Sequence, residues 1–215
     1  MIPSEHGLKI SREGPYICHM NESFLVRELP FVLFVIIILV RGIFSAKKTR
    51  RALSKLTSYL PGALSKFPFD SSYKGIYQGL NFTIALTQGG RNSPPCLKIS
   101  LMKKSTFKLS LYRESNLSEL GKKMGVVREV KVYDEFFDKE FLIFSNKPDR
   151  ATSYFSNSEI KNAARELLGS GFSSLIINAQ GLTIQKTNYS LNIDIEPQRI
   201  VNIMQKLSIL ARGCN

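Results

Sequence analysis

Residues 24–44 read FLVRELPFVLFVIIILVRGIF and are the most apolar stretch of the chain. Between residues 29 and 40 no side chain is charged or able to hydrogen bond, so a helix here is apolar on every face. A helix in a soluble core usually keeps a polar stripe, whereas lipid surrounds a helix uniformly. At 1.5 Å per residue the stretch extends about 31 Å, close to a bilayer core. We therefore predict a transmembrane helix over residues 24–44, with Arg27, Glu28 and Arg41 reaching the headgroups.

Two other interpretations of this stretch are open, a buried core helix or strand and a cleaved signal peptide. A cleavage site needs small residues, but the bulky Phe44 stands at one of the required positions, which favours a retained signal anchor. Pro30 suits an early helical turn, where its missing N–H costs little. In the N-terminal tail, residues 1–23, Met20 is an alternative translation start that would make the preceding residues a gene-model artefact.

The charges on either side of the apolar stretch predict its orientation. Three basic residues precede its centre, Lys9, Arg12 and Arg27. Seven follow it, Arg41, Lys47, Lys48, Arg50, Arg51, Lys55 and Lys66. Basic flanks stay on the cytoplasmic side, so we expect a single-pass protein of the cell inner membrane with its C-terminal domain in the cytoplasm.

Residues 45–69 have the pattern of a basic amphipathic linker. Leucines recur at spacings of three and four, at Leu53, Leu56, Leu60 and Leu64. Arg50, Arg51 and Lys55 lie among them and are candidate contacts for anionic lipid headgroups, each worth about 1 kcal/mol, with the leucines at the acyl boundary. A solvated basic flank without lipid preference explains the same pattern equally well.

Composition excludes several classes of protein. The chain has 215 residues, 43% hydrophobic and 22% charged, which indicates a folded domain rather than disorder. The three cysteines form no C-x-x-C pair, and no histidine follows His19, so we expect no disulfide framework, no cofactor, no metal site and no Ser-His or Cys-His catalysis in the domain. The net charge of +13 is not accompanied by any nucleic-acid recognition motif, so nucleic-acid binding is not favoured.

Residues 70–215 predict an α+β domain. Apolar residues alternate with polar ones in segments 73–79, 81–86, 97–101, 107–112 and 172–187, which indicates strands of a mainly antiparallel sheet. The last segment is expected to form two strands joined near Gln180 and Gly181. We expect a hairpin between the segments at 97–101 and 107–112. Lys98, Lys108 and Arg113 would share its solvated face, and Lys98 and Lys108 are further candidates for lipid contact.

Helices are predicted between and after the strands. They are expected at residues 117–124, from Pro148, from a capping box formed by Ser156 and Glu159, and from Pro197 to the C-terminus. The apolar face of the last helix is expected to consist of Ile200, Ile203, Met204, Leu207, Leu210 and Ala211. Residues 134–138 are expected to form an acidic turn between two strands. A sheet closed into a barrel by the final helix, as in pleckstrin-homology-like domains, would suit this order of elements.

The segment YDEFFDKEFLIFSNKP, residues 133–148, resembles a motif of uncharacterised bacterial membrane proteins, F-[DE]-x-x-F-x-V-x-S after an anchor and a G-x-x-x-G strand. Phe137, Asp138 and Phe141 match, isoleucine stands for the valine, and Gly75 and Gly79 supply the glycine pair. The chain departs from the pattern in lacking a glycine-aspartate pair before the phenylalanines. The resemblance implies a membrane-anchored domain of unknown function and supplies no catalytic residue.

Three functional hypotheses follow. The first is a cytoplasmic binding or scaffold domain that is held at the membrane and recruits a protein partner. The second is a peripheral domain that senses anionic lipid through the basic linker and the Lys98/Lys108 face. The third is a carboxylate-based enzyme using Asp134, Asp138 and Glu140, although such clusters are commonly surface turns.

Overall fold

The computed structural model describes residues 22–66, 70–90, 93–113 and 129–214. The chain divides into two compact units, Met1–Gly42 and Ile43–Asn215. The helix predicted at residues 117–124 lies outside the described residues.

Helix α1 (Glu22–Ser54) begins in the first unit. Within the described part of the chain, one helix is long and apolar enough to cross a membrane, and its most apolar window has a mean hydropathy of 2.1 and no buried residue. Large side chains such as Phe31 and Phe34 are 65% and 61% exposed, as a membrane anchor requires. Pro30 lies inside α1, so its predicted place in an early turn is wrong.

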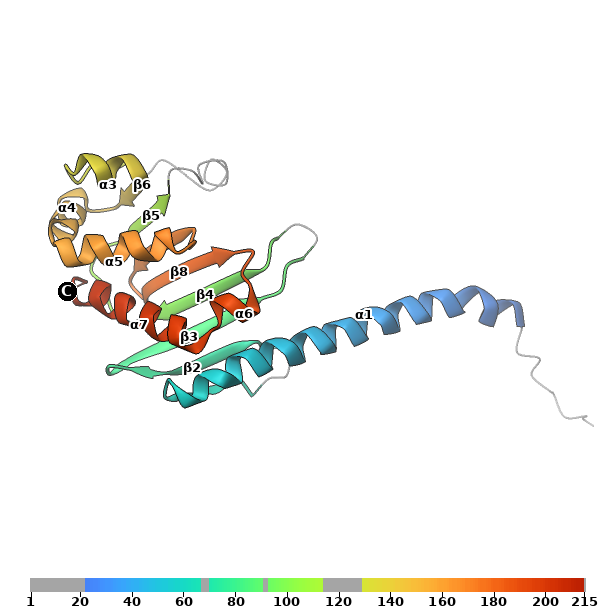
Figure 1. The fold of residues 1–215 in the computed structure, drawn as a ribbon. Coiled ribbons are helices and arrows are strands. Elements are labelled where there is room, and N and C mark those ends of the chain that lie inside the picture. The colour runs from blue at the N-terminus through green and yellow to red at the C-terminus, as the bar shows by residue number, and fades with distance from the viewer. Residues whose placement is uncertain (1–21, 67–69, 91–92, 114–128, 215) are drawn as a thin grey trace, which may run out of the picture. The chain divides into compact units, whose positions relative to one another are not determined.

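The second unit contains one antiparallel sheet of eight strands, in the order β1-β2-β3-β4-β8-β7-β5-β6 (Figure 1). The strands are β1 (Gly62–Leu64), β2 (Ser72–Tyr77), β3 (Leu80–Thr87), β4 (Cys96–Leu101), β5 (Leu109–Arg113), β6 (Phe141–Ser145), β7 (Ser174–Asn178) and β8 (Gly181–Thr187). β1 and β6 are the two edges, so the described strands form an open sheet in place of a closed barrel. The predicted α+β class, with an N-terminal apolar helix and an antiparallel sheet, is confirmed.

The helices of this unit are short except for the last. They are η1 (Lys55–Ser58), α3 (Glu135–Glu140), α4 (Pro148–Ser156), α5 (Ser158–Gly169), α6 (Leu191–Asp194) and α7 (Pro197–Arg212). In α7 the six predicted apolar positions, from Ile200 to Ala211, are all buried, which confirms its predicted face. Asn157, rather than the predicted Ser156, caps α5, because its carboxamide oxygen accepts from the amides of Glu159 and Ile160.

Alternation along the strands, clearest in β3 and β4, gives the sheet two different faces. On the first face, register partners on six strands form a row of completely buried side chains, Ile84, Ile99, Ile184, Leu175, Leu111 and Ile143. Burial of each contributes about 1.5–3 kcal/mol relative to exposure. Helices α5 and α7 lie across the sheet in Figure 1, and their apolar side chains share one core with this row. On the second face, the partners Thr83, Ser100 and Thr183 are polar and half-buried.

The leucines of the basic segment belong to this core. Leu53, Leu56 and Leu60 are 0%, 0% and 2% exposed. The hydroxyl of Tyr73 in β2 donates to the carbonyl of Leu60 at 2.6 Å. Since protein covers these side chains, their predicted place at the acyl boundary of a membrane is wrong. Their spacing is that of a helix end packed on its own domain.

Two local predictions are also wrong. β4 pairs with β3 and β8, and β5 with β6 and β7, so no hairpin joins β4 to β5. The predicted acidic turn is helix α3, because the Asp134 carboxylate accepts from the Phe137 amide and so starts a helix. In contrast, β7 and β8 form the predicted hairpin near Gln180 and Gly181.

Candidate functional site

A groove opens on the second face of the sheet, over β3, β4 and β8, and has a volume of about 840 Å³. Its polar lining comes from three kinds of side chain: the lysines Lys98, Lys103 and Lys104, the hydroxyl residues Thr83, Ser100 and Thr183, and the carboxamides Asn178 and Gln180. The turn at residues 178–181 closes one end. We call this cavity the basic groove. It is large enough for a ligand of ordinary small-molecule size.

The positions of the groove side chains follow from strand register. Lys98 and Ser100 alternate with the buried Ile99 along β4, so both project from the second face. Ser100 and Thr183 are partners on neighbouring strands, and their hydroxyl oxygens lie 3.0 Å apart. Each hydroxyl keeps acceptor and donor capacity beyond that single bond, so the floor of the groove can hydrogen bond a ligand.

The closing turn depends on a glycine. The Asn178 carboxamide oxygen accepts from the amides of Gln180, at 2.8 Å, and Gly181, at 3.3 Å. Gly181 has φ +143°, and a Cβ there would lie 2.2 Å from the carbonyl oxygen of Leu101 in β4. Only glycine allows the turn to approach β4 so closely.

The charge of the groove is one-sided. Among the residues described as lining it, three carry a positive charge and none carries a carboxylate. Lys98 and Lys104 are exposed, and Lys103 is half-buried. A cavity of one charge sign concentrates ligands of the opposite sign, so the groove is suited to an anion.

Of the predicted lipid-contact residues on the sheet, Lys98 lines the groove and Lys108 does not. Lys108 precedes β5 and is exposed, and its amide donates to the Asn146 carboxamide at 2.7 Å. Arg113 has the same parity along β5 as the buried Leu111, so it is not on the face that carries Lys98, and its guanidinium pairs with Glu140 at 3.1 Å. Lys103 and Lys104 were not predicted as site residues, although two adjacent lysines directly after an alternating strand could have indicated a basic surface there.

The other three predicted contacts, Arg50, Arg51 and Lys55, lie at the end of α1 and in η1. Arg51 and Lys55 are exposed, while the Arg50 guanidinium donates to the Asp70 carbonyl at 3.5 Å. The basic side chains of this segment are thus at the surface, while its leucines are buried in the domain. Their lipid contact stays a prediction.

The acidic residues of the third hypothesis have structural partners. The Asp134 carboxylate accepts from Lys161 Nζ at 2.6 Å, and this bond, followed by that of the Phe137 amide, holds the pKa of Asp134 below its ordinary value. Asp138 accepts from the Val132 amide at 3.0 Å, and Glu140 pairs with two arginines. No group of three metal-ligating side chains occurs among the described residues.

The matching phenylalanines of the 133–148 segment also have a structural explanation. Phe137 and Phe141 are buried with ring centroids 4.8 Å apart, and Phe137 packs on Phe155 at 5.2 Å. Burial in the core accounts for both rings without a functional role.

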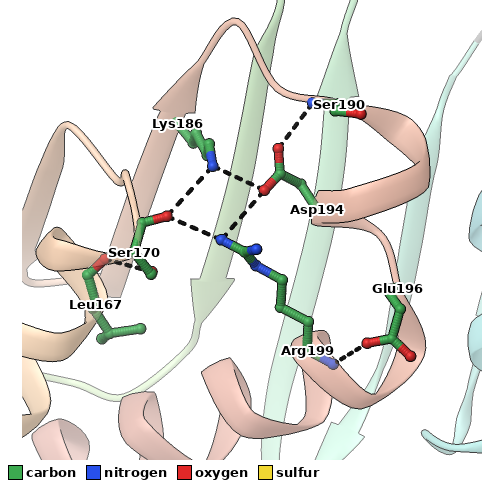
Figure 2. Close-up of polar contacts among 7 residues, drawn as sticks. All are labelled: Leu167, Ser170, Lys186, Ser190, Asp194, Glu196 and Arg199. Carbon is green, nitrogen blue, oxygen red and sulfur yellow. Dashed lines mark hydrogen bonds and ion pairs between the residues drawn. The ribbon is translucent and has the colours of Figure 1, made fainter.

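A buried ion cluster lies at the end of β8, where the core face meets α6 and α7 (Figure 2). The Asp194 side chain is 4% exposed and contacts Lys186 Nζ at 2.8 Å and Arg199 Nη2 at 3.5 Å. Its second oxygen accepts from the Ser190 amide at 2.8 Å. Both cations also donate to the carbonyl of Ser170, at 3.4 and 2.9 Å.

The cluster joins four parts of the domain. Ser170 follows α5, Lys186 is in β8, Asp194 ends α6 and Arg199 begins α7. The Glu196 carboxylate caps α7 by accepting from two amides, one of them that of Arg199. Because Asp194 pairs with both cations and both cations donate to the Ser170 carbonyl, the cluster ties α5, α6 and α7 to β8.

Comparisons with known proteins give one informative result. No protein-family model matches the chain, and no curated protein matches it. Among solved structures, the chain is similar to the mycobacterial trehalose monomycolate transport factor A, TtfA, with a TM-score of 0.50 and 8% identity. The match covers 80% of this chain and 94% of that chain. At this identity the likeness shows the fold alone. The protein is thus an α+β domain that follows a helix of membrane-spanning length.

Proposed function

We propose that the protein is a membrane-anchored, single-pass binding domain whose ligand occupies the basic groove. The groove is the observation that carries this proposal, because it combines a volume of about 840 Å³ with hydroxyl donors and three cations. The helices pack on the other face of the sheet, so ligand entry does not require the core to open.

The anchor and the charge distribution support the cellular arrangement. An apolar segment of α1 precedes the domain, and Lys47, Lys48, Arg50 and Arg51 follow that segment within the same helix. This order favours a cytoplasmic domain on the inner membrane of a cell. The fold shared with a mycobacterial transport factor is compatible with a role beside a membrane, but a fold does not specify a ligand.

The experiment is photo-crosslinking of the full chain in its native membrane. A benzophenone amino acid replaces Met102, which lines the groove and is 54% exposed. The matched control replaces Gln205, an exposed residue of α7. The proposal predicts an adduct of defined mass at Met102 and none at Gln205. Equal labelling of the two sites, or none at either, would contradict it.

A further inference from the structure

We infer that the ligand of the basic groove is an anionic lipid, whose phosphate group is held by Lys98 and Lys103. The inference rests on the proposed function and adds the chemical class of the ligand. It uses charge, the size of the groove and the nature of its remaining walls.

Charge selects the head of the ligand. Lys98 reaches the groove from β4, and Lys103 reaches it from the segment that follows β4. A lysine ammonium is a compact charge with three donors and binds phosphate as a point charge. The hydroxyls of Ser100 and Thr183 add donors on the floor between the strands. No carboxylate lines the described groove to repel the anion.

Size and apolar surface select the rest of the ligand. A volume of about 840 Å³ is far more than an inorganic phosphate fills and is near the upper end for drug-sized ligands. The lining also has an apolar part that includes Ala85, Met102 and Ala179, and Met102 is 54% exposed. Burying these side chains against an apolar tail removes apolar surface from water and so favours binding. A ligand with an anionic head and an apolar tail fits both parts, and a chain with a membrane-spanning helix meets such molecules in the bilayer.

The absence of tryptophan allows a site-specific test. Met102→Trp places a single fluorophore at the groove, and Gln205→Trp places one on α7 as a control for nonspecific partition. The full chain, in phosphatidylcholine nanodiscs, is titrated with dihexanoyl phosphatidic acid. Parallel titrations use dihexanoyl phosphatidylcholine, which keeps the tails and lacks net charge, and inorganic phosphate, which lacks tails.

The expected result is a saturable emission change of Met102→Trp with phosphatidic acid alone. Lys98→Gln and Lys103→Gln, each in that background, should weaken binding about threefold to tenfold, as expected for charged hydrogen bonds in a half-open site. Lys139→Gln, an exposed lysine of α3, should change affinity less than about twofold. The substituted lysines are exposed or half-buried, so thermal unfolding should be unchanged and serves as the folding control.

Each other outcome overturns the inference in a defined way. Equal binding of phosphatidylcholine, which carries a phosphate but no net charge, would contradict selection of an anionic lipid. Equal binding of inorganic phosphate would show that the apolar tails do not contribute. If no titrant binds while a protein crosslinks at Met102, the occupant is a protein segment, and the proposed function stands without the lipid. If neither titration nor crosslinking gives a signal, both fail.

Discussion

Asp194→Asn tests whether the buried ion cluster holds the helices on the sheet. The substitution removes the negative charge but keeps an oxygen that can accept from the Ser190 amide. Removing one partner of a buried ion pair costs about 3–5 kcal/mol. The side chains of Lys186 and Arg199 are 18% and 31% exposed, and in the variant both can still donate to the Ser170 carbonyl. We therefore expect the free energy of unfolding to fall by less, about 2–3 kcal/mol.

The assay is thermal unfolding of the full chain in a nonionic detergent, followed by circular dichroism. For a domain of this size the expected loss lowers Tm by about 4–12 °C. The triple variant Asp194→Leu, Lys186→Met, Arg199→Met should recover much of the loss, because it leaves no unpaired charge. A change below about 0.5 kcal/mol for Asp194→Asn would refute the role assigned to the cluster.

Three further variants test the fold. Leu56→Ala should lower the free energy of unfolding by about 2–5 kcal/mol, because it leaves a cavity at a buried position. The exposed control Lys55→Ala should change it by less than about 0.5 kcal/mol. Equal effects of the two variants in urea denaturation would place Leu56 outside the core. Gly181→Ala should lower the free energy of unfolding by at least about 2 kcal/mol, since its Cβ would meet the β4 backbone. Gly169→Ala, with open space around it, should not destabilise the domain. A lower Tm for Gly169→Ala than for Gly181→Ala would contradict the close approach of the turn to β4. Burial raises the pKa of Cys214 to about 11, so as the pH rises the thiol ionises in the unfolded chain before it ionises in the folded one. The free energy of unfolding should therefore be unaffected by this group below about pH 9 and should fall by about 2 kcal/mol as the pH rises toward 11. Cys214→Ala should show a shallower fall over that range, and parallel pH profiles of the two chains would show that the thiol is not the cause.

Local pattern was sufficient to predict most strands and the last helix. The alternation in β4 and β8 and the spacing of apolar residues in α7 are properties of a few consecutive residues, and burial follows them closely. The β7–β8 hairpin was also accessible, because its turn lies at Gln180 and Gly181 between two alternating runs.

Pairing between distant strands was not accessible in this way. β4 pairs with β8, so Ser100 bonds to a residue 83 positions later, while the nearer β5 pairs elsewhere. No feature of the short segment between β4 and β5 distinguishes a hairpin from a crossover. For the same reason the place of Lys103 beside β8 in the groove was not predicted.

The two polar sites differ in how far the sequence revealed them. Alternation placed Lys98 on the solvated face of the sheet, and the groove lies on that face, but the groove itself was not predicted. The ion cluster joins Ser170, Lys186, Asp194 and Arg199, which have no common period and come together only when α5, β8, α6 and α7 pack. The leucines at the end of α1 show the opposite problem, because an amphipathic pattern does not tell a membrane surface from a protein core.

The central claim is that the ligand occupies the basic groove, and crosslinking in native membranes tests it most directly. The measurement is the yield and mass of the adduct formed from position 102, compared with position 205 on the helix face. A third site at Ile76, which is 55% exposed in β2 but outside the groove lining, separates the groove from the sheet edge. The account predicts a discrete adduct at position 102 that is reduced by Lys98→Gln and Lys103→Gln together. Equal yields at all three positions, unaffected by the lysine substitutions, would contradict it.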